Sequence, residues 1–486
     1  MFKVLLINPN KWGRGITHIW IASHSSMLKK KNIKVELFDA TFYKNWTDNE
    51  VEFATSTGMF KKSSYLDLVK FKKNDVKQDL QKKIRDFKPN IIFWSAISSH
   101  IHSEGEYVNI QNGYELIKDL DTCNALLVTA GLQATSTPEN VFKNFEKIDY
   151  LIRGESELIL TKIAQLLKND KDISSVNGLS YKKNNKIIKN PPQKIIQSLD
   201  ILTPYDYSLF DDQVFFRPYN GKVLRAVDIE LSRGCIYSCS YCVETVIQKY
   251  YSFNEFSNKT GAITNFQSYL RSKSTEEAFK EIEYLNKEKN IKLFRCQDTN
   301  FLTNRREILN NLAQKIKKSS LDIKLYIETR PEGINEKSIQ LLKDLKVDGI
   351  GMGIELADED FRMKNLNRFA NQKKTIEAFD ILKKNNIKRT SYNVIGFPEQ
   401  TEDSILNTIQ LNKRLNPDNI TLVFYSPYNG TGQHLAGVKE NIFDDYEYSA
   451  DAALRSKTKG KKLSLEKLNY YKKNFIKLVK DAKKLS

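Results

Sequence analysis

Cysteine is scarce in this sequence, with 5 residues among 486. So few thiols cannot form a disulfide framework, and clustered cysteines in a reducing compartment indicate metal binding or catalysis. Long hydrophobic runs are also missing, because no stretch approaches the roughly 18 apolar residues that mark a transmembrane helix. The apolar stretch after Met1 is too short for a signal-peptide core, and no small-residue cleavage site follows it. We therefore expect a cytoplasmic protein.

Acidic residues are outnumbered, with 59 Asp and Glu against 77 Lys and Arg, a formal net charge of +18. Residues 455–486 hold 12 Lys or Arg and only two acidic residues, a net +10, so more than half of the excess lies in one tail. A nucleic-acid groove needs basic residues interleaved with aromatic ones across a folded face. The sequence has no such pattern, and we expect no nucleic-acid partner.

The first part of the chain, residues 1–170, alternates short apolar strands with segments of helical period. The length exceeds what one hydrophobic core usually supports, so we expect two or three domains. Near-continuous apolar strands separated by helices predict a parallel sheet covered on both faces, an α/β doubly wound fold of flavodoxin type. Ligands bind such sheets at the carboxyl ends of the strands. The predicted strands are Phe2–Ile7, Val35–Phe38, Ile91–Ala96, Ala125–Ala130 and Tyr150–Ile152.

A second series of strands and helices follows a connector. Residues 171–222 contain Pro191-Pro192 and an Asn-rich turn at 184–185, which predict a linker with a small hairpin. Six strand–helix units then fit within residues 223–436, whereas a closed eight-stranded barrel takes about 250 residues. We therefore predict a partial six-stranded barrel, with residues 437–486 as a basic helical tail. Its predicted strands are Val227–Leu231, Leu293–Gln297, Leu325–Glu328, Gly349–Glu355, Ser391–Ile395 and Ile420–Phe424.

The strongest chemical signal opens this second series. Cys235, Cys239 and Cys242 follow a predicted strand end with the spacing C-x3-C-x2-C. A tetrahedral zinc site usually takes four Cys or His ligands, and the only later histidine is His434. Three thiolates suit a [4Fe–4S] cluster whose fourth iron stays open for a small molecule.

With this motif the chain resembles the radical S-adenosylmethionine (SAM) superfamily, in particular its branch with a cobalamin-binding domain. The resemblance extends to about residue 436. It implies that the open iron binds the amino and carboxylate groups of SAM, and that an electron from the cluster yields methionine and a 5′-deoxyadenosyl radical. It also places Tyr241 beside the adenine.

The same resemblance assigns further SAM-binding residues at the barrel strand ends. Asp298 lies where relatives position the SAM amino group, Arg330 ends the third strand, and Glu355 closes a "G-I-E" strand near the ribose. Ile395 and Gly396 open a turn beside the adenine, in which Gln400 replaces the usual Glu. This replacement puts an ionic role at position 400 in doubt.

The N-terminal domain resembles the cobalamin-binding module of the branch. Two of its strand-end segments match the module's loops, although Gln133 replaces the usual His, and both could equally be tight strand–helix turns. The module's Asp-x-His-x-x-Gly segment is missing after the first strand, so we predict that no histidine coordinates cobalt from below. The implied cobalamin-binding residues are Asn8, Gly131, Gln133, Ala134, Thr135, Gly154 and Glu155.

Two classes of function follow from the resemblance. In the first, the chain is an enzyme that cleaves SAM and uses cobalamin to methylate an unactivated carbon, or a variant that performs cyclisation or rearrangement. In the second, it is a non-catalytic sensor of corrin or redox state. The intact cysteine motif favours the enzyme. Because Cys123 and Cys296 are isolated, we expect one cluster only, and we interpret both as buried core thiols.

The expected partners are a substrate and an electron donor. The substrate is a small molecule, lipid or natural product, and the segment 244–272 could cover the active site. The donor would be a flavodoxin or ferredoxin. Apolar residues of the tail recur at helical spacing, so a basic amphipathic helix could contact an anionic membrane or the acidic donor, or could simply pack on the barrel. These residues are Leu468, Tyr471, Phe475, Leu478 and Val479.

Overall fold

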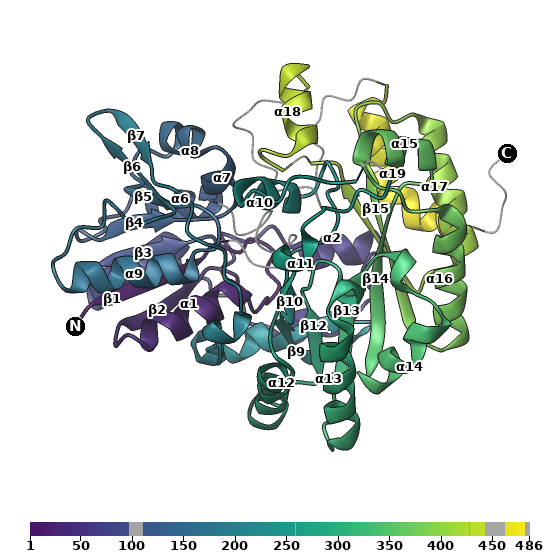
Figure 1. Ribbon diagram of the computed structural model, residues 1–486, viewed down its shortest axis with the longest axis horizontal. Coiled ribbons are helices and arrows are strands. Elements are labelled where there is room, and N and C mark those ends of the chain that lie inside the picture. Colours follow the sequence, from purple (N-terminus) through teal and green to yellow (C-terminus); the bar gives the residue numbers. More distant parts are fainter. Residues whose placement is uncertain (97–109, 258, 427, 443–461, 482–486) are drawn as a thin grey trace. The chain divides into compact units, whose positions relative to one another are not determined.

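The computed structural model describes residues 1–96, 110–257, 259–426, 428–442 and 462–481. The chain divides into two compact units (Figure 1). The first comprises Met1–Val51, Tyr65–Arg217 and Val246–Phe253, and the second comprises Glu52–Ser64, Pro218–Thr245 and Asn254–Ser486. None of the described helices is both long enough and apolar enough to cross a bilayer.

The first unit is built on a seven-stranded sheet of order β2-β1-β3-β4-β5-β6-β7. The first five strands pair in parallel, and this 2-1-3-4-5 order is that of a flavodoxin-like fold. All five predicted strands are present, and the hairpin expected in the connector extends the sheet as two antiparallel strands. The strands are β1 (Lys3–Asn8), β2 (Lys34–Asp39), β3 (Ile91–Trp94), β4 (Leu126–Thr129), β5 (Tyr150–Ile152), β6 (Leu179–Lys183) and β7 (Lys186–Lys189).

Helices between these strands cover the sheet, as the doubly wound prediction requires. Helix α1 (Ile19–Lys29) packs beside α9 (Glu157–Lys168), where Ser23 Oγ donates to Glu157 Oε1 at 3.3 Å. Helix α4 (Val76–Phe87) begins at its cap Asp75, whose carboxylate accepts the Gln78 N–H, and packs beside α6 (Ile110–Ile117). Shorter helices are α3 (Tyr65–Leu68), α7 (Leu132–Ser136) and α8 (Pro138–Asn144), while α2 (Glu50–Ser56) and α10 (Glu244–Tyr250) run from one unit into the other.

The second unit is a curled, open sheet of order β16-β15-β14-β13-β12-β9-β8. Its six predicted strands pair in parallel, as the partial-barrel prediction requires, and β8 joins at one edge. The strands are β8 (Phe216–Tyr219), β9 (Lys222–Ile229), β12 (Leu293–Cys296), β13 (Lys324–Thr329), β14 (Val347–Glu355), β15 (Lys388–Ile395) and β16 (Asn419–Phe424).

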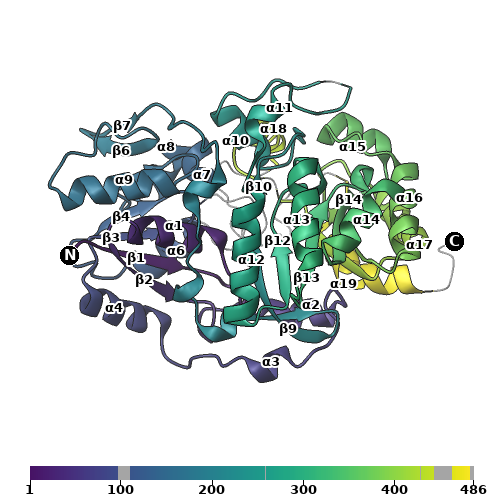
Figure 2. The ribbon, with the colours of Figure 1, turned by 60° about the horizontal axis from the view of Figure 1, so that its bottom comes forward.

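The helices that connect these strands lie along the outer side of the curled sheet (Figure 2). Side chains alternate along each strand, so one face of the sheet packs on these helices and the other lines the interior of the partial barrel. The connecting helices are α12 (Thr275–Lys289), α13 (Arg306–Lys318), α14 (Glu336–Asp344), α16 (Gln372–Lys384) and α17 (Glu402–Leu415), with α11 (Phe266–Tyr269), α15 (Glu359–Leu366) and α18 (Gly432–Lys439) outside this series.

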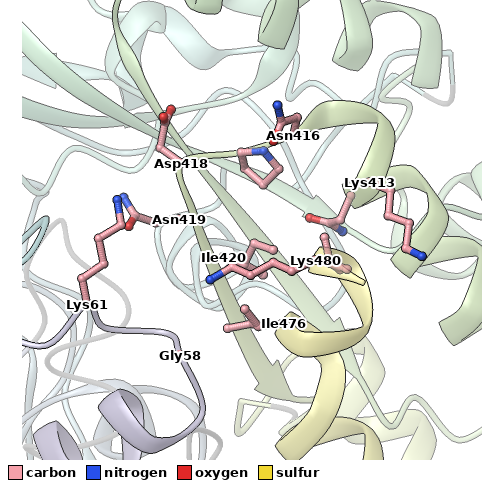
Figure 3. Close-up of a pocket in the computed structure, with 12 residues that line it drawn as sticks. Gly58, Lys61, Lys413, Asn416, Asp418, Asn419, Ile420, Ile476 and Lys480 are labelled. Atoms are coloured by element: carbon pink, nitrogen blue, oxygen red, sulfur yellow. The ribbon is translucent and has the colours of Figure 1, made fainter. Parts of the chain in front are cut away.

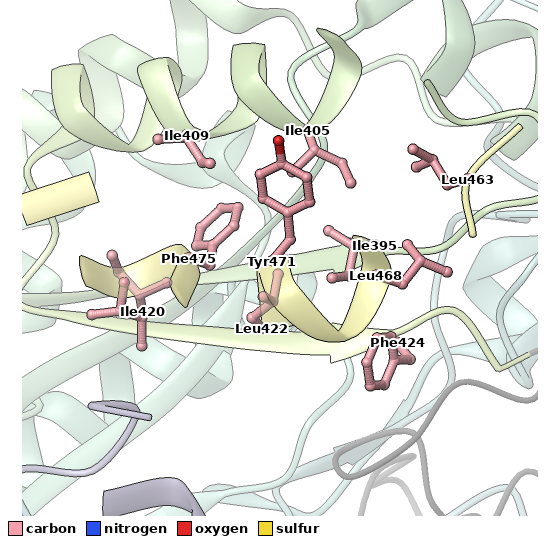
Figure 4. Packing of buried hydrophobic residues seen from close by; sticks show 11 residues of the cluster. Ile395, Ile405, Ile409, Ile420, Leu422, Phe424, Leu463, Leu468, Tyr471 and Phe475 are labelled. Atoms are coloured by element: carbon pink, nitrogen blue, oxygen red, sulfur yellow. The ribbon is translucent and has the colours of Figure 1, made fainter. Parts of the chain in front are cut away.

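The C-terminal helix α19 (Leu465–Lys480) covers the edge strand β16. Its residues Leu468, Tyr471, Phe475 and Ile476 are buried against β15, β16 and α17 (Figure 4). Tyr471 also donates its hydroxyl hydrogen to Glu402 Oε1 at 2.8 Å. The predicted helix is therefore present, and its apolar face packs on the barrel. That face is not available for the membrane contact considered from the sequence.

Candidate functional site

The three cysteines lie on a loop that leaves the carboxyl end of β9. A short strand β10 (Ser232–Arg233) pairs with β11 (Arg271–Ser272) just before the loop. Arg233 forms a buried two-point ion pair with Glu230 at 2.8 and 3.0 Å. Gly234 then turns the chain with φ of 97°, and a Cβ there would lie 2.7 Å from the Tyr269 carbonyl oxygen. The sequence before Cys235 thus fixes the direction in which the loop starts.

Backbone hydrogen bonds from two other segments hold the loop. Ser238 N–H donates to the Gly261 carbonyl at 2.7 Å, so the aromatic-rich segment 244–272 does contact the cysteine loop. Ser240 N–H donates to the Leu366 carbonyl at 3.0 Å, and the Asn367 side chain donates to the Ser238 carbonyl at 2.7 Å. These three hydrogen bonds hold the loop in place.

Burial and nearby charges change the pKa values of the cysteine thiols. Burial, with Glu244 nearby, raises the pKa of Cys235 to about 12, although the Tyr237 N–H bond to its sulfur opposes the rise. Burial and Glu244 also raise the pKa of Cys242 well above its ordinary value. Iron must therefore displace protons from these thiols when it binds.

The described side chains do not bring any three His, Cys, Asp or Glu residues together around a single metal ion. Three cysteine thiols on one loop are the donor set of a [4Fe–4S] cluster whose fourth iron has no protein ligand.

Glu355 lies beside the cysteine loop in a strained backbone conformation. Its φ is 62°, an uncommon value for a residue with a Cβ, and the pairing of β14 with β15 shifts register between Gly353 and Glu355. Tyr241 donates its hydroxyl hydrogen to Glu355 Oε1 at 3.0 Å. Arg368 lies 3.7 Å from the same carboxylate and also donates to the Gly353 carbonyl.

The structure thus brings together two residues that the sequence assigned to SAM, Tyr241 and Glu355, and adds Arg368, which sequence reasoning missed. Arg368 follows α15 in a stretch without a motif, and only its buried position between Tyr241 and Glu355 identifies it. The pKa of Tyr241 is raised well above its ordinary value by burial and by Glu355. The phenol therefore stays protonated and donates.

Asp298 makes structural hydrogen bonds with both of its oxygens. Its Oδ1 accepts the Leu231 N–H at 2.8 Å, and its Oδ2 accepts from Ser232 Oγ at 2.6 Å and Asn304 Nδ2 at 2.8 Å. Burial nevertheless raises the pKa of Asp298 to about 6. These bonds tie the end of β12 to the chain that enters the cysteine loop, and a contact with the SAM amino group stays a prediction.

Arg330 lies against the cysteine loop. Its guanidinium stacks 3.7 Å from the Tyr237 ring centroid, pairs with Glu332 at 2.6 Å, and places Nη1 4.0 Å from Cys239 Sγ. Asn300 Oδ1 supports this position by accepting from Thr329 Oγ1 at 2.7 Å. Arg330 and Arg368 thus supply positive charge beside Cys239, although contact between Arg330 and SAM stays a prediction.

The turn after β15 retains its internal hydrogen bond despite the unusual residue at position 400. Gly396 has φ of 91°, and its N–H donates to Gln400 Oε1 at 2.7 Å. Ile395, before it, is fully buried in the core. An amide oxygen accepts this bond as a carboxylate oxygen would, so the structural role at position 400 does not need a negative charge.

The two remaining cysteines differ from each other. Cys296 is buried on β12, as predicted, and burial raises its pKa well above the ordinary value. Cys123 is half-buried in a turn, with φ of 52° and its N–H donating to Asp121. The interpretation of Cys123 as a buried core thiol is therefore wrong, because Cys123 lies in a turn three residues before β4 begins at Leu126.

The carboxyl edge of the first unit carries two buried polar atoms to which no described residue donates a hydrogen bond. Asn8 Nδ2 donates to Asp39 Oδ1 at 3.1 Å, and Thr41 Oγ1 donates to the same oxygen at 2.5 Å. Asn8 Oδ1 and Asp39 Oδ2 are buried, and neither has a hydrogen-bond partner among the described residues. Both atoms can accept hydrogen bonds from a ligand's N–H or O–H groups.

The other predicted cobalamin residues lie on two connected turns of the same edge. Thr135 Oγ1 donates to the Gly131 carbonyl at 2.8 Å and accepts the Gly154 N–H at 2.9 Å. Ala134 and Gln133 are buried on the first turn, in α7. Their contact with a corrin stays a prediction.

Tyr251 covers the second turn. The Glu155 N–H donates to its hydroxyl at 2.9 Å, and a Cβ on Gly154 would lie 2.3 Å from that oxygen. The Glu155 carboxylate also accepts the Ile196 N–H at 3.1 Å. Gly154 and Glu155 therefore seat an aromatic side chain, a role that the local sequence did not reveal.

One pocket of about 280 Å³ lies away from the cysteine loop. It is lined by Lys61, Asn419 and Lys480 among others, and β16 begins at Asn419 (Figure 3). The pocket therefore lies at the amino end of this strand, whereas the cysteine loop, Glu355 and Gly396 lie at the carboxyl ends. It is not part of the candidate site.

Comparison with known proteins agrees with this geometry. Residues 229–411 match the family model of the radical SAM superfamily, and these residues include the cysteine loop, Glu355 and Gly396. This matched segment is similar to the radical SAM superfamily, whose members use a [4Fe–4S] cluster and SAM.

Individual relatives are more distant. The chain is 26% identical over 353 residues to an uncharacterized methyltransferase of Pyrococcus horikoshii, covering 73% of this chain and 70% of the relative. It is 24% identical over 417 residues to the anaerobic magnesium-protoporphyrin IX monomethyl ester cyclase of Rubrivivax gelatinosus, covering 83% and 69%.

Among solved structures, the radical SAM methyltransferase TsrM of Kitasatospora setae, determined with cobalamin and a [4Fe–4S] cluster bound, is similar in fold. The TM-score is 0.66 at 14% identity, with 94% of this chain and 79% of TsrM covered. This similarity shows that the two-domain fold is shared and does not by itself transfer an activity.

Proposed function

We propose that this protein is a cobalamin-dependent radical SAM methyltransferase that acts on an unactivated carbon. The observation that carries the proposal is the combination of a hydrogen-bonded three-cysteine loop in one unit with a flavodoxin-like carboxyl edge in the other. At this edge, buried acceptor atoms of Asn8 and Asp39 have no hydrogen-bond partner among the described residues.

The residues around the loop fit a cluster and SAM. Cys235, Cys239 and Cys242 would hold the cluster, which supplies the electron for reductive cleavage of SAM when it is bound. Arg330 and Arg368 provide positive charge for the SAM carboxylate, because both guanidinium groups interact with Cys239. Glu355 faces this cluster of groups, and its carboxylate can accept hydrogen bonds from the two ribose hydroxyls.

The residues at the sheet edge fit a corrin with amide side chains. Such amides donate N–H groups, and Asn8 Oδ1 and Asp39 Oδ2 are buried acceptors without a donor in the described part of the chain. Burial raises the pKa of Asp39, although Thr41 and Asn8 donate to it. A ligand donor at Oδ2 would stabilise its charged form. The bare backbone at Gly131, with φ of 110°, allows close approach of a planar ligand.

A cyclase or rearrangement enzyme with the same cofactors is the second candidate. It is favoured by the similarity to the anaerobic cyclases, one of which matches over 83% of this chain. A non-catalytic sensor is disfavoured, because buried thiols and paired arginines beside them are not needed to bind a corrin alone.

Product analysis tests the proposal. Purified protein with a reconstituted cluster and cobalamin is incubated with SAM, a reductant and a cell extract as the source of substrate. We expect both 5′-deoxyadenosine and S-adenosylhomocysteine. Deoxyadenosine without S-adenosylhomocysteine would support the cyclase alternative, and the absence of both would refute enzymatic function. A variant with Cys235, Cys239 and Cys242 replaced by Ala should lose the iron–sulfur absorbance and both products while it stays folded.

A further inference from the structure

Charged and polar side chains lie on the interior face of the partial barrel, beside the apolar residues Ala226 and Leu293. On β12, Phe294 and Cys296 are buried towards the helices, so Arg295 between them faces the interior. The same alternation along β13 places Tyr326 and Glu328 on that face, because Leu325 and Ile327 are fully buried on the other. A wholly apolar substrate would offer the Arg295 guanidinium no hydrogen-bond acceptor.

Among the described residues, no carboxylate forms an ion pair with the Arg295 guanidinium. Its neighbours in the sheet register are Asp228 on β9 and Tyr326 on β13. The guanidinium lies 5.2 Å from the Tyr326 ring centroid, and within the described part of the chain it makes neither a hydrogen bond nor an ion pair within 4 Å. Its Nε is buried without an acceptor, while the side chain as a whole is half-buried.

Arg295 keeps its positive charge in this position. Burial alone would lower its pKa, but Asp228, two tyrosines and Glu328 lie close enough to raise it. A planar guanidinium with free N–H groups matches two oxygens of one carboxylate or phosphate.

A chain of hydroxyl groups lies next to Arg295. Tyr392 donates to Glu328 Oε1 at 3.0 Å, so its oxygen accepts from the Tyr326 hydroxyl at 2.8 Å. Only Oε1 of the Glu328 carboxylate is used by a described residue, and the side chain is half-buried. The other oxygen can accept a hydrogen bond from a ligand.

Glycines on β14 make room for these tyrosines. A Cβ on Gly351 would lie 2.3 Å from the Tyr392 hydroxyl, and a Cβ on Gly349 would lie 3.0 Å from the Tyr326 ring. Ile350 and Met352 alternate with them and are fully buried. Strand β14 therefore has no inward side chains where Tyr326 and Tyr392 lie against it.

We propose that Arg295 binds an anionic oxygen group of the substrate, a carboxylate or a phosphate, and that Glu328 accepts from a hydroxyl or amine close to that group. This inference rests on the proposed function, because it assigns the substrate of the same barrel. It defines a polar, charged small molecule as the substrate class and excludes a simple lipid chain.

Ligand-observed saturation-transfer NMR tests the inference without turnover. The holoenzyme, with its cluster reconstituted, SAM saturating and no reductant, is mixed with malate, serine, glycerol 3-phosphate, ethanolamine and glycerol. Saturating SAM keeps these probes out of the SAM site. We expect a signal from at least one anionic probe, and whether it is a carboxylate or the phosphate ester identifies the group. Ethanolamine and glycerol should give none.

Substitutions then assign the binding to Arg295. Arg295→Gln should weaken binding of the anion by about tenfold or more, since a charge-assisted two-point contact is lost. Arg295→Lys should weaken binding less, because lysine keeps the positive charge although it loses the two parallel N–H groups of the guanidinium. Arg306→Gln is the matched control, because this exposed arginine at the start of α13 donates to the Lys337 carbonyl on the outer side of the barrel. Cluster absorbance and melting temperature check that each variant is folded.

Three results would overturn the inference: equal affinity in Arg295→Gln, equal binding of the neutral or cationic probes, or no anion-dependent signal in the wild-type protein. None of them depends on SAM cleavage. The inference can therefore fail while the proposed function holds. If the protein does not cleave SAM, the NMR binding result can still be interpreted.

Discussion

Asp298 gives the most quantitative prediction for this fold. Its carboxyl is buried and hydrogen-bonded by Leu231, Ser232 and Asn304, yet burial holds its pKa at about 6 instead of 3.8. The protonated form is thus favoured by the folded state. The stability that Asp298 contributes is fully present below pH 4 and is lost as the pH rises through 6.

The size of this effect follows from linkage. A rise of about two pKa units corresponds to about 3 kcal/mol between the two protonation extremes. Between pH 5 and pH 8 the expected loss is about 1.4 kcal/mol of unfolding free energy, because a part of the titration lies below pH 5. Asp298→Asn cannot titrate. It should be less stable at every pH because its amide has a single acceptor oxygen for the three donors Leu231, Ser232 and Asn304, but this deficit should shrink by about 1.4 kcal/mol from pH 5 to pH 8.

Urea unfolding followed by circular dichroism at the two pH values measures this difference. Taking the wild type minus the variant removes the contributions of all other titrating groups. Asp86→Asn is the control, since Asp86 is an exposed residue of α4 and changes the net charge equally. A deficit for Asp298→Asn that is constant with pH, or that grows towards pH 8, would refute the assigned direction of the shift.

Two further predictions concern the tail and the corrin. Phe475→Ala should lower the unfolding free energy by about 3–5 kcal/mol, because Phe475, on α19, is fully buried against α17 and β16. Tyr470→Ala, at an exposed position of the same helix, should change it little. Equal effects of the two substitutions in thermal melts would contradict the packing of α19. Co(II) cobalamin bound to the protein should show no nitrogen superhyperfine splitting in electron paramagnetic resonance, because no Asp-x-His-x-x-Gly segment follows β1. His24, on α1, uses both ring nitrogens on Trp20 and Ser156, at 2.6 and 2.9 Å. His100 and His102 lie outside the described residues, and a nitrogen triplet that vanishes in a His18, His100 or His102 to Ala variant would contradict this prediction.

The strands could be predicted from the sequence because they are buried on both faces. In β1, β3 and β4 nearly every residue is buried, so the apolar runs are continuous and end at turn residues. The cysteine spacing likewise predicted the cluster ligands from the sequence, since ligands on one loop are close in sequence as well as in space. Both signals are local.

The contacts that shape the site are not local. Tyr251 covers Gly154 across 96 residues of sequence from Glu155, and Arg368 meets Tyr241 from a position 127 residues away. Residues 52–64, although they precede most of the flavodoxin-like sheet, belong to the barrel unit. Nothing in the composition of these segments distinguishes them from surface loops, and only the folded chain brings them to their partners.

Strand β13 connects the proposed chemistry with the proposed substrate anchor. Tyr326, Glu328 and Arg330 are alternate residues of one extended stretch, so they follow one another on the interior face. Arg330 lies at the cysteine loop, and Tyr326 lies beside Arg295. At about 3.3 Å per residue, the anchor and the loop are roughly 13 Å apart along the strand. A substrate held at Arg295 has to span most of this distance before one of its carbons reaches the radical, so the anchor selects for the length of the substrate as well as for its charge.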